Sequence, residues 1–127
     1  MDFAKQLYPW IDFRVWDLNK PTSLRADSVV CVEAFEHVAD PNLAMRNPLE
    51  AANHELWIST PNNSNHDRNP PDNPYHIAEY SIKEMLAIIH ENSNCPISID
   101  ILDWETFKPI ESGKSQVSPV VYWIRKQ

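Results

Sequence analysis

The stretch Asp27–Pro41, DSVVCVEAFEHVADP, decides the fold. Its apolar run from Val29 to Val32 is short and uninterrupted, which is typical of a strand buried on both faces of a helix-covered parallel sheet. Two acidic residues, Glu33 and Glu36, follow this run, and His37 comes next. Because open α/β sheets bind their ligands at the carboxyl ends of the strands, we expect the functional site to lie there.

The segments on either side of this stretch alternate between strand and helix patterns. The pattern predicts further strands at residues 11–16, 55–60, 98–104 and 119–124. It predicts helices at residues 2–8, 41–49 and 81–92. Asp40 and Pro41 form a strong helix start, and Pro48 predicts a break near the end of that helix. Ser81 and Glu84 match a capping box at the start of the last helix.

This order of elements predicts an α/β fold with a mostly parallel sheet. The last two strands, joined by residues 105–118, are expected to form an antiparallel pair. A long polar segment, residues 61–80, connects the strand at 55–60 to the last helix. Loops of this length inside a compact domain are usually functional, so we expect this loop to shape a binding site.

Length and charge exclude several classes of protein. The chain has 127 residues, which suits one domain with a real core, and a formal net charge of -7. Such a charge disfavours nucleic acid as a partner. No stretch is apolar enough for a membrane span or a signal peptide, so we expect a cytoplasmic protein with no membrane contact.

The few glycines and cysteines limit the kinds of binding site and thiol chemistry that this chain can have. Gly113 is the single glycine, so the chain holds neither a phosphate-binding P-loop nor a GxGxxG turn. Cys31 and Cys95 lie far apart in the sequence. Cys31 falls within the apolar run, so we expect it to be a packed, reduced thiol.

Four segments together resemble class I S-adenosylmethionine-dependent methyltransferases. DSVVCVEAFEHVADP resembles the family's fourth-strand signature, which commonly has the pattern FDVVxxxEVIEHVxDP. Ile58–Asn62, ISTPN, is similar to the end of the fifth strand, and Asn73–Ser81, NPYHIAEYS, is similar to the segment before the following helix. Ile11–Leu18, IDFRVWDL, resembles the third strand, whose last acidic residue often faces the cofactor's adenine.

The resemblance also shows what this sequence lacks. The family's first strand, its glycine-rich loop and the second strand with its ribose-binding acid would precede residue 1, and residues 51–54 replace a usual Gly-Gly. The resemblance therefore implies a truncated Rossmann-like methyltransferase sheet in a single, N-terminally incomplete domain, residues 1–127. The implied strand order is 11–16, 29–32, 55–60, 119–124 and 98–104. We expect direct pairing of the first two strands, or a homodimer through the open edge, instead of a free edge.

The resemblance places the cofactor at two strand ends. Asp17 and Leu18 would lie beside the adenine of S-adenosylmethionine. Cys31, Val32 and Glu33 would lie beside its methionine portion, where the Glu33 carboxylate could accept hydrogen bonds from the ammonium group.

No residue can be assigned a catalytic role from the sequence, and His37 and His76 are the candidates. His37 could act as a base, since histidine is the side chain most often used for that role, although Glu36 and His37 also suit a structural role before the helix. His76, in the NPYH segment, could contact a substrate or anchor the loop. No metal site is expected, because the loop residues with ligand side chains lack the spacing of a rigid metal site: His66, Asp67, Asp72 and His76.

Two functions remain open at this point. The first is S-adenosylmethionine-dependent methyl transfer to a small-molecule or glycan-like acceptor, conditional on the missing elements, so the chain alone is not expected to be active. The second is a catalytically inactive methyltransferase-fold remnant that acts as a binding or assembly module. A sequence that represents only part of a longer active enzyme would give the same pattern.

Overall fold

The computed structural model describes residues 2–64, 71–110 and 117–127. Its elements in chain order are α1 (Asp2–Leu7), β1 (Ala26–Val32), the 3-10 turn η1 (Phe35–His37), α2 (Pro41–Ala51), β2 (Ala52–Thr60), α3 (Ile82–Asn92), β3 (Ile97–Asp103) and β4 (Val120–Lys126). The loop residues His66 and Asp67, and Gly113, lie outside the described residues. Within the described part of the chain, no helix combines the length and the apolar character that a membrane span needs.

The four strands form one mixed sheet in the order β1-β2-β4-β3. β1 and β2 are parallel, with Val30 opposite Trp57, whereas β4 runs antiparallel to both β2 and β3. This order confirms the sequence of the last four predicted strands and the antiparallel terminal pair. The prediction of a mostly parallel sheet is wrong, because β4 inserts between β2 and β3 and makes two of the three pairings antiparallel.

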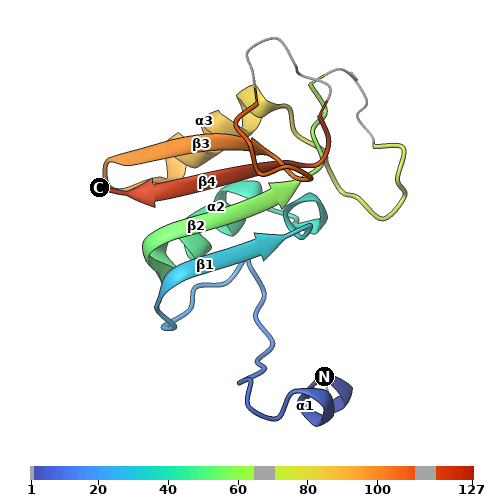
Figure 1. Cartoon of the computed structure of the whole chain (residues 1–127), viewed down its shortest axis with the longest axis vertical. Coiled ribbons are helices and arrows are strands. Elements are labelled where there is room, and N and C mark those ends of the chain that lie inside the picture. The colour runs from blue at the N-terminus through green and yellow to red at the C-terminus, as the bar shows by residue number, and fades with distance from the viewer. Residues whose placement is uncertain (1, 65–70, 111–116) are drawn as a thin grey trace.

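The helices α2 and α3 cover one face of this sheet (Figure 1). Alternate strand residues turn toward these helices and form the core, including Leu56, Ile58, Tyr122 and Ile124 together with Met45, Met85 and Ile89 of the helices. The predicted burial of the Val29–Val32 run on both faces is wrong, since Val30 is 63% exposed and Val32 is 49% exposed. Val29 and Cys31 alternate with them and pack on the helix side.

Helix α2 begins where the sequence predicts and ends later. The Asp40 side chain accepts hydrogen bonds from the backbone N–H groups of Asn42 and Leu43, at 2.9 and 3.1 Å. The predicted break at Pro48 is wrong, because the helix continues to Ala51 with Pro48 buried in its last turn. A proline there removes only one backbone hydrogen bond near the end of the helix, where the carbonyl of Pro48 still accepts from Ala52.

The capping box of α3 is confirmed. The backbone N–H of Glu84 donates to the Ser81 hydroxyl at 3.1 Å, and the Ser81 N–H donates to the Glu84 carboxylate at 2.8 Å. The helix start is therefore set locally, directly after the loop that ends at Tyr80.

The predicted strand at residues 11–16 is wrong. Residues 8–25 contain no strand, and α1 lies away from the sheet (Figure 1). Among the described residues, no strand pairs with the outer edge of β1, so direct closure onto that edge is also wrong. An alternating segment becomes a strand only when a neighbouring strand satisfies its backbone. The helix predicted at residues 2–8 is present as α1, although Phe3 is 73% exposed.

Candidate functional site

The carboxyl ends of β1 and β2 meet at a turn that begins at Glu33. The Glu33 N–H donates both to the backbone carbonyl and to the side-chain hydroxyl of Ser59, at 3.1 Å each. Glu33 has a φ of 47°, in the left-handed region that few residues other than glycine and asparagine adopt. The chain therefore makes a strained change of direction directly after the apolar strand.

The carboxyl of Glu33 is electrostatically coupled to its neighbours. Glu33 is exposed as a residue, but its carboxylate is partly shielded from water. This desolvation raises the pKa of Glu33. The Ser59 hydrogen bond lowers this pKa, the charge of Glu36 raises it, and His76 and His37 lower it. Glu33 is thus the outer member of a group of charged side chains at the strand ends.

Glu36 is the buried centre of this group. Its side chain is 1% exposed and its carboxylate accepts a hydrogen bond from the Thr60 hydroxyl at 3.2 Å. The backbone carbonyl of Glu36 accepts from the N–H groups of Ile77 and Ala78, at 2.8 and 3.3 Å. The same residue therefore presents a carboxylate at the end of β2 and holds the loop against η1.

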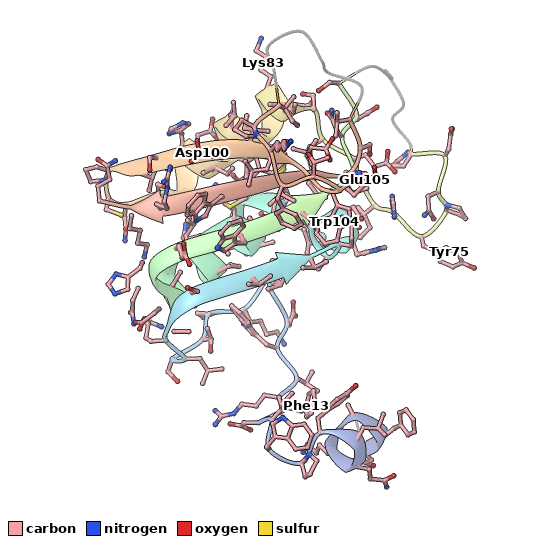
Figure 2. The ribbon with its side chains drawn as sticks, viewed as in Figure 1. Phe13, Tyr75, Lys83, Asp100, Trp104 and Glu105 are labelled. Atoms are coloured by element: carbon pink, nitrogen blue, oxygen red, sulfur yellow. The ribbon has the colours of Figure 1, made fainter. Side chains whose placement is uncertain are left out.

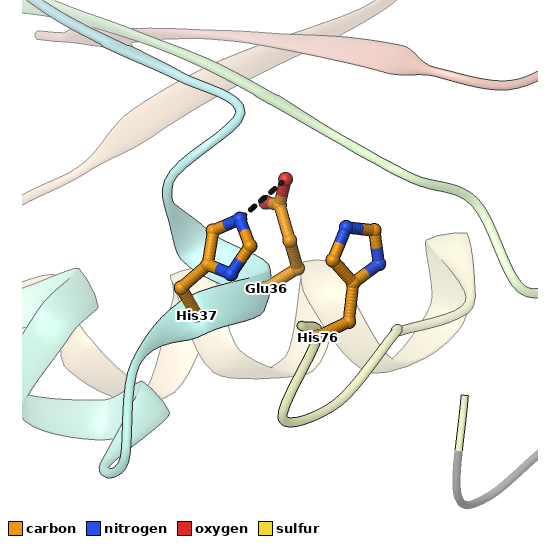
Figure 3. A group of neighbouring side chains, drawn as sticks. All are labelled: Glu36, His37 and His76. Carbon is orange, nitrogen blue, oxygen red and sulfur yellow. Dashed lines mark ion pairs between the residues drawn. The ribbon is translucent and has the colours of Figure 1, made fainter. Parts of the chain in front are cut away.

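Two histidines flank the Glu36 carboxylate (Figure 3). The Nε2 atom of His37 lies 3.7 Å from a Glu36 carboxylate oxygen, and the His37 and His76 rings meet edge to face with centroids 5.0 Å apart. One potential ligand atom from each of the three residues lies within 4.8 Å of the other two. We call Glu36, His37 and His76 the Glu-His-His cluster.

The hydrogen bonds of the cluster define which ring nitrogens carry protons. The Nδ1 atom of His37 lies 2.7 Å from the backbone carbonyl of Tyr75, which can only accept, so this nitrogen donates. The Nδ1 atom of His76 lies 2.6 Å from the Glu79 carboxylate and donates likewise. In the neutral rings the Nε2 atoms of both histidines therefore carry lone pairs.

The residues predicted to bind the cofactor fall into two groups. Cys31, Val32 and Glu33 lie in β1 and its turn, beside the Glu-His-His cluster. The Asp17 carboxylate accepts from the Asn19 N–H of its own turn at 2.9 Å, and Leu18 packs against the core while its carbonyl accepts from Asn47 of α2. Their cofactor roles stay predictions.

The thiol of Cys31 is unsuited to nucleophilic chemistry. Burial, with a smaller contribution from the charge of Glu36, raises the pKa of Cys31 to about 11. The thiol is therefore protonated near neutral pH, as expected for a packed residue.

An apolar hollow of about 230 Å³ lies on the open face of the sheet near the same strand ends. It is lined mainly by Val30, Val32, Trp57, Trp104, Phe107 and Val121. Trp104 follows β3 and lies over the end of β2 in Figure 2. A hollow of this size is smaller than the usual pocket for a drug-sized ligand, so it suits one small apolar group at most.

Sequence reasoning named His37 and His76 separately and missed that they share a site with Glu36. The spacing of ligand side chains within the loop gives no sign of this cluster, because two of its residues lie in η1 and the third lies in the segment that ends at Tyr80. Both parts of the cluster can be recognised in the sequence, as a Glu-His pair that follows a strand and as the histidine of NPYH. Only the fold brings the two parts together.

No protein-family model and no curated protein sequence matches this chain. Many solved structures of methyltransferases do resemble it. The N-terminal domain of EvdMO1, in the presence of SAH and D-fucose, is 13% identical with a TM-score of 0.66, over 99% of this chain and 60% of that chain. Magnesium protoporphyrin IX methyltransferase from Synechocystis PCC 6803 with bound SAH is 11% identical with a TM-score of 0.63, over 99% and 57%.

The small RNA methyltransferase HEN1 is also similar, at 14% identity and a TM-score of 0.64, over 88% of this chain but only 15% of that protein. The chain thus spans less than two thirds of the length of each of these three structures. At such identities the likeness concerns the fold. The described chain has part of the Rossmann-like fold of S-adenosylmethionine-dependent methyltransferases.

Proposed function

We propose that this chain is part of an S-adenosylmethionine-dependent methyltransferase and contributes both to its acceptor site and to its cofactor site. The observation that carries the proposal is the meeting of Glu33 and the Glu-His-His cluster at the carboxyl ends of β1 and β2, on a methyltransferase-like sheet. Ligands of open α/β sheets bind at this edge. The glycine-rich turn and ribose-binding acid would come from outside these 127 residues.

In this proposal Cys31, Val32 and Glu33 lie along the methionine portion of the cofactor, and Asp17 and Leu18 lie beside its adenine. The Glu33 carboxylate accepts hydrogen bonds from the ammonium group. Methyl transfer from a sulfonium needs chiefly an acceptor held in line, so His37 and His76 serve as candidate bases or acceptor contacts. A small-molecule or glycan-like acceptor is consistent with this proposal, and one similar structure was obtained in the presence of SAH and D-fucose.

Calorimetric titration of the chain with S-adenosylmethionine, and with its demethylated product, tests the cofactor part. Because the glycine-rich turn and the ribose-binding acid would come from outside these residues, we expect weak binding that is detectable only at high ligand concentration. Glu33→Gln should weaken it by about a further tenfold, because the charged hydrogen bond to the ammonium is lost. Asp27→Asn is the matched control, since Asp27 lies at the opposite end of β1. Absence of heat at millimolar ligand would show that these residues do not bind the cofactor by themselves.

The second candidate is a non-catalytic binding or assembly module, and the outer edge of β1 favours it. Val30 and Val32 are exposed beside a strand edge that no described residue pairs. Such an edge can add a strand from a second copy of the chain. Analytical ultracentrifugation should then show a dimer that Val30→Lys dissociates, whereas a wild-type monomer at high concentration argues against assembly through this edge.

A further inference from the structure

We propose that the Glu-His-His cluster binds a divalent first-row transition-metal ion. Glu36 and His37 come from η1 and His76 from the distant loop, and their potential ligand atoms lie within 4.8 Å of one another. Bonds of roughly 2.0–2.2 Å to a tetrahedral ion hold neighbouring ligand atoms about 3.5 Å apart. The 3.7 Å between His37 Nε2 and the Glu36 oxygen already fits, so only small side-chain movements complete the site.

Both histidines are held as metal-binding histidines usually are. Each ring donates its Nδ1 proton to an oxygen acceptor, His37 to the Tyr75 carbonyl and His76 to the Glu79 carboxylate. An acceptor on the remote nitrogen fixes the tautomer and makes the other nitrogen a better ligand. Both Nε2 lone pairs are therefore available to an ion.

One local hydrogen bond would give way on binding. The Asn73 side-chain amide lies 3.1 Å from His76 Nε2, and its oxygen accepts from the Tyr75 N–H at 3.0 Å, which orients the amide nitrogen toward the ring. The ion would replace the Asn73 amide as the partner of this lone pair. Asn73 is exposed, so its amide can turn to water.

The buried carboxylate supplies an independent reason for a cation. Glu36 is 1% exposed, and its hydrogen-bond donor is the neutral Thr60 hydroxyl. In the part of the chain that the structure describes, Glu36 has His37 as its ion-pair partner, and the neutral form of His37 carries no charge. A buried carboxylate is costly without a compensating cation, and a bound ion would supply one.

The donor set indicates the class of ion. Imidazole nitrogens suit zinc, copper, iron and nickel, whereas magnesium and calcium prefer sites made of oxygen. Two nitrogens and one carboxylate therefore favour Zn²⁺ over Mg²⁺. Three protein ligands leave one position of a tetrahedral ion open to water or a bound molecule. The His37 side chain is 45% exposed, so an ion can reach the cluster from solvent.

The test is calorimetric titration of the whole chain with Zn²⁺ and with Mg²⁺, in the absence of S-adenosylmethionine. We expect one Zn²⁺ per chain, much weaker binding of Mg²⁺, and a melting temperature that rises with Zn²⁺ concentration. His37→Ala and His76→Ala should each weaken Zn²⁺ binding by at least about tenfold. His54→Ala is the matched control, because His54 is exposed and lies beside Asp27, away from the cluster.

Glu36 is buried, so Glu36→Gln requires a check of folding by circular dichroism. His37→Gln, at a half-exposed ring, provides a variant that keeps the fold. A Zn²⁺-induced shift of the Nε2 resonances of His37 and His76 in nitrogen NMR would support the site directly. Absence of Zn²⁺ binding, or equal binding by the His37→Ala/His76→Ala double variant, would overturn the proposal. Both readouts are independent of cofactor binding and of methyl transfer.

Discussion

The two faces of the sheet carry similar apolar side chains and have different surroundings. On one face Leu56, Ile58 and Tyr122 are buried under α2 and α3. On the other face Val30 is 63% exposed, although it lies in the same apolar run as buried Cys31. Apolar composition therefore indicates which segments are strands, whereas the helices packed on the sheet decide which face is buried.

The open face is organised by aromatic and polar contacts in place of a helix layer. The Trp57 and Trp123 rings stack with centroids 4.7 Å apart, and the Arg125 guanidinium lies 4.2 Å from the Trp123 ring centroid. Glu55 accepts a hydrogen bond from the Trp123 indole at 2.7 Å, and Asp100 pairs with Arg125. These contacts shield the aromatic rings from water without burying them fully.

The largest contrast between the faces is expected from matched truncations. Leu56→Ala on the covered face should lower the free energy of unfolding by about 2–5 kcal/mol, because it leaves a cavity in the core. Val30→Ala on the open face should cost less than about 1 kcal/mol. Urea unfolding measures both, and equal losses would show that the open face is buried in solution.

The stacked tryptophans should make a smaller, measurable contribution. A double-mutant cycle with Trp57→Leu and Trp123→Leu is expected to give a coupling energy of about 0.5–1.5 kcal/mol, the range for aromatic pairs. Additive losses in urea unfolding would mean that the two rings do not interact.

The covered face contains one polar group that opposes its packing. The Tyr122 hydroxyl is buried and has no hydrogen-bond partner among the described residues, and burial also raises the pKa of Tyr122. Tyr122→Phe should therefore raise the free energy of unfolding by about 1 kcal/mol. Thermal unfolding measures the change, and a loss of stability would show that the hydroxyl has a partner in solution.

The smallest expected effect concerns the turn at Glu33. Glu33→Asn should raise the free energy of unfolding by about 0.5 kcal/mol near neutral pH, because asparagine tolerates the left-handed conformation and carries no charge.

The pH dependence separates these two causes. Since the pKa of Glu33 is raised in the folded chain, its ionised form opposes folding above that pKa, and this cost vanishes as pH falls below the unfolded value. The charge part of the gain should therefore disappear in acid while the backbone part remains. Urea unfolding across this pH range measures both, and a gain independent of pH would exclude the charge contribution.

Much of the candidate site was predictable in pieces. The end of the Val29–Val32 run, the Glu36-His37 pair and His76 were each singled out as features near a strand end or a loop. The grouping of Glu36 with both histidines was not predictable from spacing. It depends on the hydrogen bonds from Ile77 and Ala78 to the Glu36 carbonyl, which hold the loop against η1.

The sequence by itself determined the features that depend on neighbouring residues, because caps and periodicity act over one or two turns. These include the capping box of α3, the Asp40 cap of α2 and the apolar strands. Only the tertiary structure decided that residues 11–16 form no strand, that one face of β1 stays open and that Glu36, His37 and His76 form a cluster. A strand needs a partner, a face needs a covering layer and a cluster needs two distant segments, and none of these is encoded locally.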